Sequence, residues 1–512
     1  MTHWKHGYFA DNGYTYGYYA ETMPSRLYWA ALIQGHVAAT GRFRYLDAGC
    51  GQGVNLVLAA AAHPQCEFVG IDFLPEHIAH ARKLADTLGL DNITLIEGDF
   101  IELAADASAH PLLTEPFDYA VCHGISTWVA PAVKEALFRL IGHVLRPGGV
   151  FYNSYNTFPG WLGMVPFQHL VLLEQRSQTG MLALNSTKAH MEHLAKNAPG
   201  LFSTLPALQK RLEGMGTLDT AYLVQEYNNQ HWQPVFVSQM MDQLSSVKLD
   251  YLGTATLTEA FDGLLPGAIR EWLAQQTTTL MKEQLRDYAI NQSFRRDLYV
   301  KGASRPWPQA HSRLLGECRF VVNPWVARPE SDQPFKIKGG SVELNGDSSF
   351  YGDMLDAVAD KSDGASIAEL IGRKADDKYR SSVVQTVSML LHGGWLMPLS
   401  DGGDCGNGKH INRAMATLVT EGAPYRYATL PKTGMACSLS ETDWLMVKAR
   451  NEGLSQEDWP AYILRGLNTL NRALAKDGKP LVDEAEKLKL LQSSIDQFVR
   501  QRLPFLIDVG AV

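Results

Sequence analysis

Tyr45-Leu46-Asp47-Ala48-Gly49-Cys50-Gly51-Gln52-Gly53 is a stretch in which an apolar segment runs into a glycine-rich turn. Residues 43–48 have the apolar character of a buried strand, and residues 54–62 that of the helix that follows the turn. Glycines between a strand and a helix allow a tight turn and let a ligand approach the exposed N–H groups of the helix N-terminus. The stretch therefore predicts a ligand-binding turn in an α/β fold.

The alternation of strand and helix continues beyond the turn. Amphipathic helices are predicted over residues 76–88 and after the fourth apolar run, where Val133, Leu137 and Leu140 share one face. Strands that are separated by helices have right-handed crossover connections and lie parallel. The sequence thus predicts an α/β, doubly wound, Rossmann-like parallel sheet, with its first five strands at residues 43–48, 67–72, 93–97, 117–122 and 150–155.

The pattern changes after residue 161. A mostly helical insertion is expected to run to about residue 228, and strands at 248–254 and 294–300 are expected to complete the sheet late. Near the C-terminus, two helices and a ribbon within residues 366–399 indicate winged-helix-like α+β packing. The predicted organisation is a Tyr-rich lid segment (1–40), a ligand-binding core (41–161), a helical middle region (162–302), a linker (303–335) and a smaller C-terminal domain (336–512).

The glycine pattern distinguishes between two classes of nucleotide ligand. A dinucleotide site needs G-x-G-x-x-G/A, but the last of these positions is Val54 in this chain. A carboxylate at Asp47 would repel an anionic pyrophosphate and attract an ammonium group. S-adenosylmethionine (AdoMet) carries such a group, and its sites typically read D-x-G-x-G-x-G. The residues assigned to AdoMet here are Asp47, Gly49, Gly51, Gly53 and Asn55.

Two more carboxylates follow the ends of the next strands. Asp72 comes nineteen residues after Gly53, where a carboxylate accepts hydrogen bonds from both ribose hydroxyls. Asp99 is placed to accept a hydrogen bond from the adenine amine, and Phe73 and Phe100 to sandwich the adenine ring. Each position has a structural alternative, because an Asp after a strand often caps a helix and a Phe is often part of the core. Their order after successive strands favours AdoMet.

The charge of the chain bears on its partners. The net charge of the 512 residues is −8, and residues 1–170 hold nine Lys and Arg against fifteen Asp and Glu. A nucleic-acid-binding protein needs clustered Lys and Arg along the phosphate backbone. We therefore expect no nucleic-acid partner.

Composition indicates an ordinary globular protein, with 46% hydrophobic and 20% charged residues. No apolar stretch is long enough for a membrane span, and the first residues lack the apolar core of a signal peptide, so a cytoplasmic location is expected. The six cysteines form no C-x-x-C pair, so no metal site is predicted.

Four blocks of sequence give the chain a closer resemblance. It resembles the bacterial class I AdoMet-dependent methyltransferases with a methyltransferase regulatory domain, which include the rickettsial protein lysine methyltransferases acting on outer-membrane protein B. The resemblance covers about residues 10–302. The blocks are Tyr14-x-Tyr16 through Thr22-Met23-Pro24-Ser25-Arg26-Leu27, His123-Gly124-Ile125-Ser126-Thr127-Trp128-Val129, Ser154-Tyr155-Asn156-Thr157-Phe158-Pro159-Gly160-Trp161 and Tyr222-Leu223-Val224-Gln225-Glu226-Tyr227.

The resemblance implies AdoMet as cofactor, methyl transfer to a protein side chain with a lysine amine favoured, and a homodimer. The chain departs from the family where Gln225-Glu226-Tyr227-Asn228-Asn229 replaces the usual His-Glu-Tyr-Leu-Glu. A small-molecule or glycan acceptor, a non-catalytic AdoMet-binding regulator and an NAD-dependent oxidoreductase remain as alternatives.

The end of the fourth strand faces the methyl group in class I methyltransferases. Here it reads Cys122-His123-Gly124 rather than Asn/Asp-Pro-Pro-Tyr, which argues against adenine N6 methylation of DNA. His123 is the candidate base, because histidine titrates near neutrality. The alternative is that His123 only offers its backbone carbonyl to the ammonium group of AdoMet. The predicted catalytic residues are His123, Tyr16 and Tyr155, while Tyr14 and His123 are also assigned to the cofactor.

Overall fold

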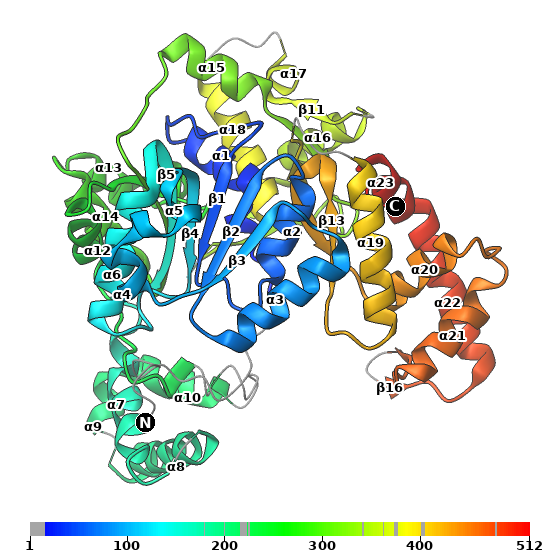
Figure 1. The fold of residues 1–512 in the computed structure, drawn as a ribbon. Coiled ribbons are helices and arrows are strands. Elements are labelled where there is room, and N and C mark those ends of the chain that lie inside the picture. The colour runs from blue at the N-terminus through cyan, green and yellow to red at the C-terminus, as the bar shows by residue number, and fades with distance from the viewer. Residues whose placement is uncertain are drawn as a thin grey trace.

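The computed structural model describes residues 16–178, 180–198, 200–215, 223, 226–339, 342–361, 363–372, 377–400, 405–476 and 479–512. A seven-stranded sheet lies at its centre, in the order β3-β2-β1-β4-β5-β7-β6 (Figure 1). The first four strands fall within a residue or two of their predicted bounds, and β5 begins earlier than predicted. The strands are β1 (Arg44–Ala48), β2 (Glu67–Asp72), β3 (Ile93–Glu97), β4 (Phe117–His123), β5 (Leu145–Asn156), β6 (Asp250–Thr254) and β7 (Phe294–Val300).

The sheet is parallel except at β7. This strand pairs antiparallel with both β5 and β6, whereas the five strands predicted to be parallel, β1 to β5, are parallel. Because β7 enters next to β5 after the long insertion, the carboxyl ends of β1 to β5 and the amino end of β7 meet at one edge of the sheet. That edge carries Asp47, Asp72, His123 and Phe294.

Helices cover both faces of the sheet. Alternate strand residues point to opposite faces, so Tyr45 packs with α1 and α2 while Leu46 packs with α6 and α12. In α3, Pro75 starts the helix, a left-handed Gly89 ends it, and the buried stripe includes Ile78. The helices are α1 (Pro24–Leu32), α2 (Val54–Ala62), α3 (Pro75–Leu88), α4 (Phe100–Ala105), α5 (Pro111–Thr114), α6 (Pro131–Val144), α12 (Val237–Ser245), α13 (Gly267–Ala274) and α14 (Thr279–Ile290).

The insertion after β5 forms a helical lobe that projects from the sheet (Figure 1). It has its own apolar core, in which Phe167 packs edge-on against Tyr227. Its helices are α7 (Val165–Glu174), α8 (Met181–Asn197), α9 (Gly200–Thr204) and α10 (Pro206–Gly214).

The segment 303–335, predicted as a linker, contains a helix and a strand. The strand β8 is the middle strand of a three-stranded sheet, and its buried Phe320 packs edge-on against Trp29 of α1. The Pro, Arg and Trp content of this segment therefore does not mark a flexible connection. The structured parts are α15 (Pro308–Glu317) and β8 (Arg319–Val322).

The C-terminal region packs directly onto the sheet domain. Every residue of α2 is buried, because one side of the helix faces the sheet and the other faces α19, β13 and β14. The winged-helix interpretation and the predicted domain boundaries stay predictions. Its elements are β9 (Phe335–Gly339), β10 (Val342–Gly346), α16 (Ser348–Ala359), β11 (Ala365–Ser366), α17 (Ile367–Ile371), α18 (Asp377–His392), β12 (Leu396–Pro398), α19 (Cys405–Thr420), β13 (Tyr427–Leu430), β14 (Met435–Ser438), α20 (Glu441–Asn451), α21 (Trp459–Thr469), β15 (Ala475–Lys476), β16 (Lys479–Pro480), α22 (Glu484–Gln497) and α23 (Leu503–Asp508).

Residues 16–40 of the predicted lid segment contain the buried helix α1, and residues 1–15 lie outside the described residues. The helix lies between the sheet and the C-terminal region, with Leu27 and Trp29 at most 1% exposed. Among residues 16–40, the short piece around Tyr19 reaches the carboxyl edge of the sheet, and the lid role stays a prediction.

Candidate functional site

The glycine-rich turn between β1 and α2 requires its glycines. Gly49, Gly51 and Gly53 have φ angles of 92°, 55° and 75°, a region that side chains other than glycine rarely adopt. A Cβ atom on Gly53 would also lie 2.4 Å from the Cβ atom of Ala81 in α3. The turn can therefore keep its shape only with glycine at position 53.

Replacing Gly53 with Ala is expected to abolish tight AdoMet binding, because both the backbone strain and the clash with Ala81 displace the turn. The matched control is Gly148→Ala, since Gly148 has a similar φ of 79° but open space around its Cβ position. This control should cost about 1 kcal/mol in stability and leave the affinity for AdoMet unchanged. Isothermal titration calorimetry measures both affinities, and equal affinities would contradict the assigned role of the turn.

Two cavities meet at this turn. The first, the turn cavity, has a volume of about 50 Å³ and is lined by Tyr19, Asp47, Asn55 and His123. The second, the Phe100 cavity, has a volume of about 50 Å³ as well. Its walls are the largely apolar set expected for an adenine ring, namely Phe73, Leu74, Phe100, Val129 and Val133, with Asp99 beside them. Gly49, Asp72, His77 and Ile125 line both cavities.

Asp72 stands at the junction of the two cavities. Its Oδ2 accepts the Gly51 N–H at 2.9 Å, its Oδ1 accepts the Leu74 N–H at 3.0 Å, and His77 Nδ1 lies 3.2 Å from Oδ1. These contacts hold the carboxylate in place as an acceptor. Ribose hydroxyls are donors, so the position fits the predicted role.

Asp99 caps a helix and also stands where it could accept a hydrogen bond from the adenine amine. Its Oδ1 accepts the Ile101 N–H at 2.8 Å and thereby caps α4, while the side chain also lines the Phe100 cavity.

Asn55 is held by the N-terminal segment. Its Oδ1 accepts the Tyr19 N–H at 2.9 Å, and its Nδ2 donates to Thr22 Oγ1 at 3.0 Å. Asn55 therefore anchors the segment that covers the turn cavity.

Asp47 lies beneath the turn, buried at the end of β1. Burial, and then the nearby Asp72 carboxylate, raise the pKa of Asp47 to about 7. A cationic group in the turn cavity would favour the ionised form and lower this pKa again. Two carboxylates thus share a site that fits an ammonium group and disfavours a pyrophosphate.

The affinity for AdoMet is expected to rise as the pH rises from 5.5 to 7.5. Below pH 7 the Asp47 carboxyl of the free protein is protonated, so binding of the ammonium group must displace a proton, at a cost of about tenfold in affinity per pH unit. The affinity at pH 5.5 should therefore be about thirtyfold lower than at pH 7.5. Asp47→Asn should bind weakly with no such slope, and a slope that survives this substitution would contradict the assignment.

His123 ends β4 at the far side of the turn cavity. Its ring stacks on Tyr19 with centroids 4.0 Å apart, and Nδ1 lies 3.0 Å from the Tyr152 hydroxyl and 3.2 Å from Ser154 Oγ. Burial lowers the pKa of His123 to about 4, so the imidazole is uncharged at neutral pH. His123 is therefore a weak base here, and it forms a fixed wall of the cavity together with Tyr19.

The other two predicted catalytic tyrosines do not reach this wall. Tyr155 is fully buried and donates a hydrogen bond to Asp297 at 2.6 Å, on the face of the sheet opposite to Tyr152. Tyr16 packs against His80 and Tyr425 and is absent from the lining of either cavity at the turn. Tyr14 lies outside the described residues.

Strand periodicity could have found the residues that sequence reasoning missed. Side chains alternate along β5, so Tyr152 and Ser154 share the face of His123 whereas Tyr155 cannot. Tyr19 had no comparable signal, because it lies in an irregular segment among several tyrosines.

A larger cavity lies beyond the Tyr19–His123 wall. This β7 cavity has a volume of about 820 Å³ and is bounded by the N-terminal segment, the amino end of β7 and strands of the C-terminal region. Tyr18 and Ala20, the neighbours of Tyr19, line it, as does Phe294, whose ring meets the His123 ring edge-on at 6.3 Å. The β7 cavity therefore adjoins the wall, while Tyr19 and His123 themselves line the turn cavity.

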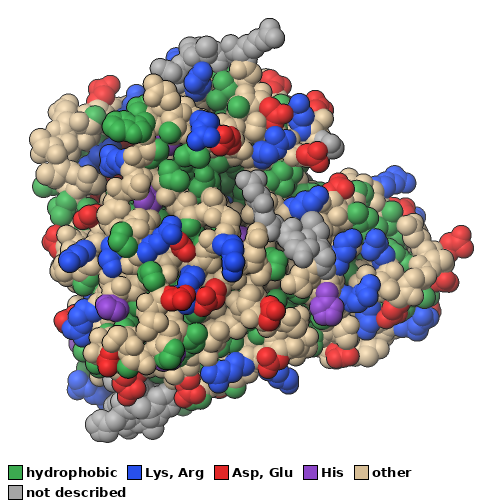
Figure 2. Space-filling view, turned by 45° about the horizontal axis from the view of Figure 1, so that its top comes forward, with side chains coloured by type: hydrophobic (Ala, Val, Ile, Leu, Met, Phe, Trp, Pro, Cys, Tyr) green, Lys and Arg blue, Asp and Glu red, His purple; other side chains and the backbone are tan. Residues whose placement is uncertain are grey.

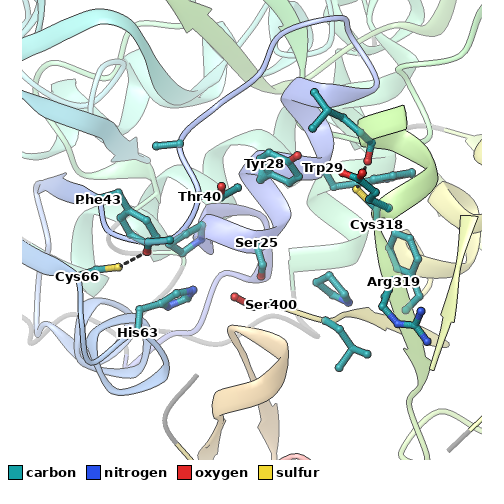
Figure 3. A pocket seen from close by; sticks show the side chains of 18 of the residues that line it. Ser25, Tyr28, Trp29, Thr40, Phe43, His63, Cys66, Cys318, Arg319 and Ser400 are labelled. Carbon is teal, nitrogen blue, oxygen red and sulfur yellow. Dashed lines mark hydrogen bonds between the residues drawn. The ribbon is translucent and has the colours of Figure 1, made fainter. Parts of the chain in front are cut away.

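A fourth cavity lies at the opposite, amino edge of the sheet (Figure 3). Phe43 and His63 approach it from the sheet domain, and Cys318 and Ser400 from the C-terminal region. A hydrogen bond from Cys66 Sγ to Gly41 O closes one side. Because this cavity lies at the start of β1 and not at its end, the glycine-rich turn does not reach it.

No metal cluster accompanies the site: within the described ranges, no group of three or more His, Cys, Asp and Glu side chains could hold a metal ion. Among the helices in the same ranges, none is long and apolar enough to cross a membrane.

Comparison with known proteins agrees with the fold and the turn. Residues 40–246 match the family model of a methyltransferase domain, and residues 219–301 match that of a predicted methyltransferase regulatory domain. The protein is an AdoMet-dependent methyltransferase. The methyltransferase is 29% identical to an uncharacterized protein of Synechocystis sp. over 522 residues, covering 99% of both chains. It is 26% identical to an uncharacterized protein of Rickettsia prowazekii, covering 55% of this chain and 50% of that protein.

A solved structure shares almost the whole fold. PKMT2 from Rickettsia typhi in complex with AdoHcy superposes with a TM-score of 0.69 at 18% identity, covering 96% of the methyltransferase and 99% of that chain. A second structure of PKMT2 from Rickettsia typhi gives a TM-score of 0.68. The shared fold thus includes the helical lobe and the C-terminal region as well as the sheet.

Proposed function

We propose that the methyltransferase transfers a methyl group to a protein side chain, with a lysine amine as the favoured acceptor. The observation that carries the proposal is the β7 cavity, which adjoins the Tyr19–His123 wall and, at about 820 Å³, is much larger than either cavity at the turn. Such a cavity has room for a side chain together with part of the backbone that presents it.

The reaction requires alignment more than activation. AdoMet supplies a methyl group on a sulfonium: the acceptor nitrogen forms a bond to the methyl carbon as the carbon–sulfur bond breaks, and the electron pair of that bond stays on sulfur in AdoHcy. Tyr19 and His123 border the turn cavity on the side of the β7 cavity, so an acceptor that reaches the methyl group from there passes beside these two rings. Because His123 is a weak base, the amine must arrive neutral, with its proton already lost to solvent.

The guanidinium of Arg296 in the β7 cavity favours a neutral amine. Arg296 Nε lies 2.6 Å from Glu21 Oε1, and both side chains line the cavity. A cation close to an amine lowers the pKa of that amine, and the lining holds two further cations, Arg26 and Lys338, besides this ion pair. We assign Tyr19, His123 and the Glu21–Arg296 pair as the groups nearest to the acceptor.

The test is transfer of tritiated methyl groups from AdoMet into a cell extract that is then separated into protein, lipid, glycan and small-molecule fractions. The proposal expects label in protein, stable to mild alkali as N-methyl groups are. Label confined to another fraction would contradict it. Tight AdoMet binding with no label in any fraction would instead favour a non-catalytic regulator.

Nucleic acid remains an unexpected acceptor. On the face shown in Figure 2, Lys and Arg side chains alternate with Asp and Glu side chains and form no continuous basic stripe. Such a surface is a poor match for a phosphate backbone. A salt-sensitive mobility shift of labelled RNA or DNA would overturn this expectation. The homodimer and the cytoplasmic location stay predictions.

A further inference from the structure

The β7 cavity carries an excess of positive charge. Three cations line it, Arg26, Arg296 and Lys338, against one carboxylate, Glu21, which is paired with Arg296. His392 adds no charge, because burial lowers its pKa to about 4. Glu21 also interacts electrostatically with Arg26, so one carboxylate faces three cations among the described residues that line the cavity.

Among these cations, Arg26 gives the clearest indication of an anionic ligand. Its side chain is 6% exposed, and its Nη1 donates to the Leu391 carbonyl at 2.7 Å, but its Nε has no hydrogen-bond partner within the described part of the chain. Burying an unpaired guanidinium N–H costs free energy that an incoming anion can recover. Arginine is also the side chain best suited to binding a carboxylate.

Lys338 lies near the mouth of the same cavity. It is exposed on β9, whose alternate residues Phe335 and Ile337 are buried. The same strand also carries Lys336, which is equally exposed but does not line the cavity. The strand thus provides one lysine inside the cavity lining and a matched one outside it.

We propose that the β7 cavity binds the acceptor as an acidic polypeptide segment, in which carboxylates beside the methylated residue pair with Arg26 and Lys338. This inference rests on the proposed transfer to protein and specifies the sequence around the acceptor. The arrangement resolves a conflict, since a cationic cavity repels a lysine ammonium group. The acidic neighbours supply the attraction that brings the segment into the cavity.

The binding test uses two fluorescein-labelled peptides and the full-length protein saturated with AdoHcy. Each peptide has one central lysine, flanked by three glutamates on both sides in the first and by three glutamines on both sides in the second. Fluorescence anisotropy measures both dissociation constants at low and at physiological salt. We expect the acidic peptide to bind at least about tenfold more tightly, with a preference that shrinks as salt increases.

Three variants test whether the preference for the acidic peptide arises in the β7 cavity. Lys338→Gln is expected to weaken binding of the acidic peptide about fivefold, and Arg26→Gln by more, with little change for the neutral peptide. Lys336→Gln, with the same loss of charge on the same strand, should change neither. Because Arg26 is buried and its variant could unfold, Lys338→Gln carries the test if Arg26→Gln loses AdoHcy binding.

The outcomes separate this inference from the proposed function. Equal affinity for the two peptides, or equal effects of Lys338→Gln and Lys336→Gln, would overturn the acidic-segment inference, even if proteins in an extract are methylated. A preference for the acidic peptide that Lys338→Gln removes would support it. Absence of label in any protein would contradict the proposed function, whatever the peptides bind.

Discussion

Replacing Arg295 with Ala is expected to destabilise the sheet domain by about 3–5 kcal/mol, because it leaves buried carboxylates without their cation. Arg295 on β7 is 2% exposed, and its guanidinium contacts Asp287 at 2.5 Å, Asp297 at 2.8 Å and Glu283 at 3.0 Å. The midpoint of thermal unfolding should fall by about 10 °C. Differential scanning fluorimetry measures it.

The matched control for this prediction is Arg139→Ala. Arg139 forms an ion pair with Glu135 on the exposed face of α6, where solvent screens the interaction. Its loss should shift the midpoint by no more than about 2 °C. Equal shifts for the two variants would show that the buried cluster does not stabilise the fold as described.

The Arg295 cluster also explains why Tyr155 lies away from the candidate methyl-transfer site. The tyrosine hydroxyl donates to Asp297, so the residue belongs to this buried network and not to the methyl-transfer site. The network ties β5, β7 and α14 together and thereby holds β7, with Phe294 and Arg296, beside His123.

Asp72→Ala is expected to lower the affinity for AdoMet by at least about 100-fold. The substitution removes an acceptor for both ribose hydroxyls, and hydrogen bonds to a charged group are worth about 1.5–3 kcal/mol each. It also releases the Gly51 N–H that orders the turn. Titration calorimetry with AdoMet and with AdoHcy should show the same loss, since the two ligands share the ribose.

Two further variants separate ligand contact from loss of order. Asp72→Asn keeps the shape of the side chain and one acceptor oxygen, so it should retain the fold and lose part of the affinity. Asp86→Asn makes the same chemical change at an exposed position of α3 and should leave binding unaltered. Unchanged affinity in Asp72→Ala would contradict the placement of the ribose.

The sequence predicted the sheet domain well because its signals are local. The glycine turn, the apolar runs and the helix stripes each depend on neighbouring residues, and β2, β3 and β7 have the predicted bounds. The antiparallel direction of β7 was not predicted, since it depends on where the chain re-enters the sheet after a long insertion.

The contacts between distant segments were the part that sequence reasoning missed. The helix Val54–Ala62 is almost entirely apolar, which indicates that other elements pack on both of its sides. This signal for the C-terminal region was present in the sequence but was not used. The wall at Tyr19 and the charges of the β7 cavity had no local signal, because Glu21 and Arg296 are 275 residues apart in sequence.

The most direct test of the central claim is an experimental structure of the protein with AdoHcy bound. We expect the adenine in the Phe100 cavity, the ribose hydroxyls on Asp72, the ammonium group near Asp47 and the sulfur facing the Tyr19–His123 wall. AdoHcy in the cavity at the amino edge of the sheet, or a ribose away from Asp72, would contradict the account.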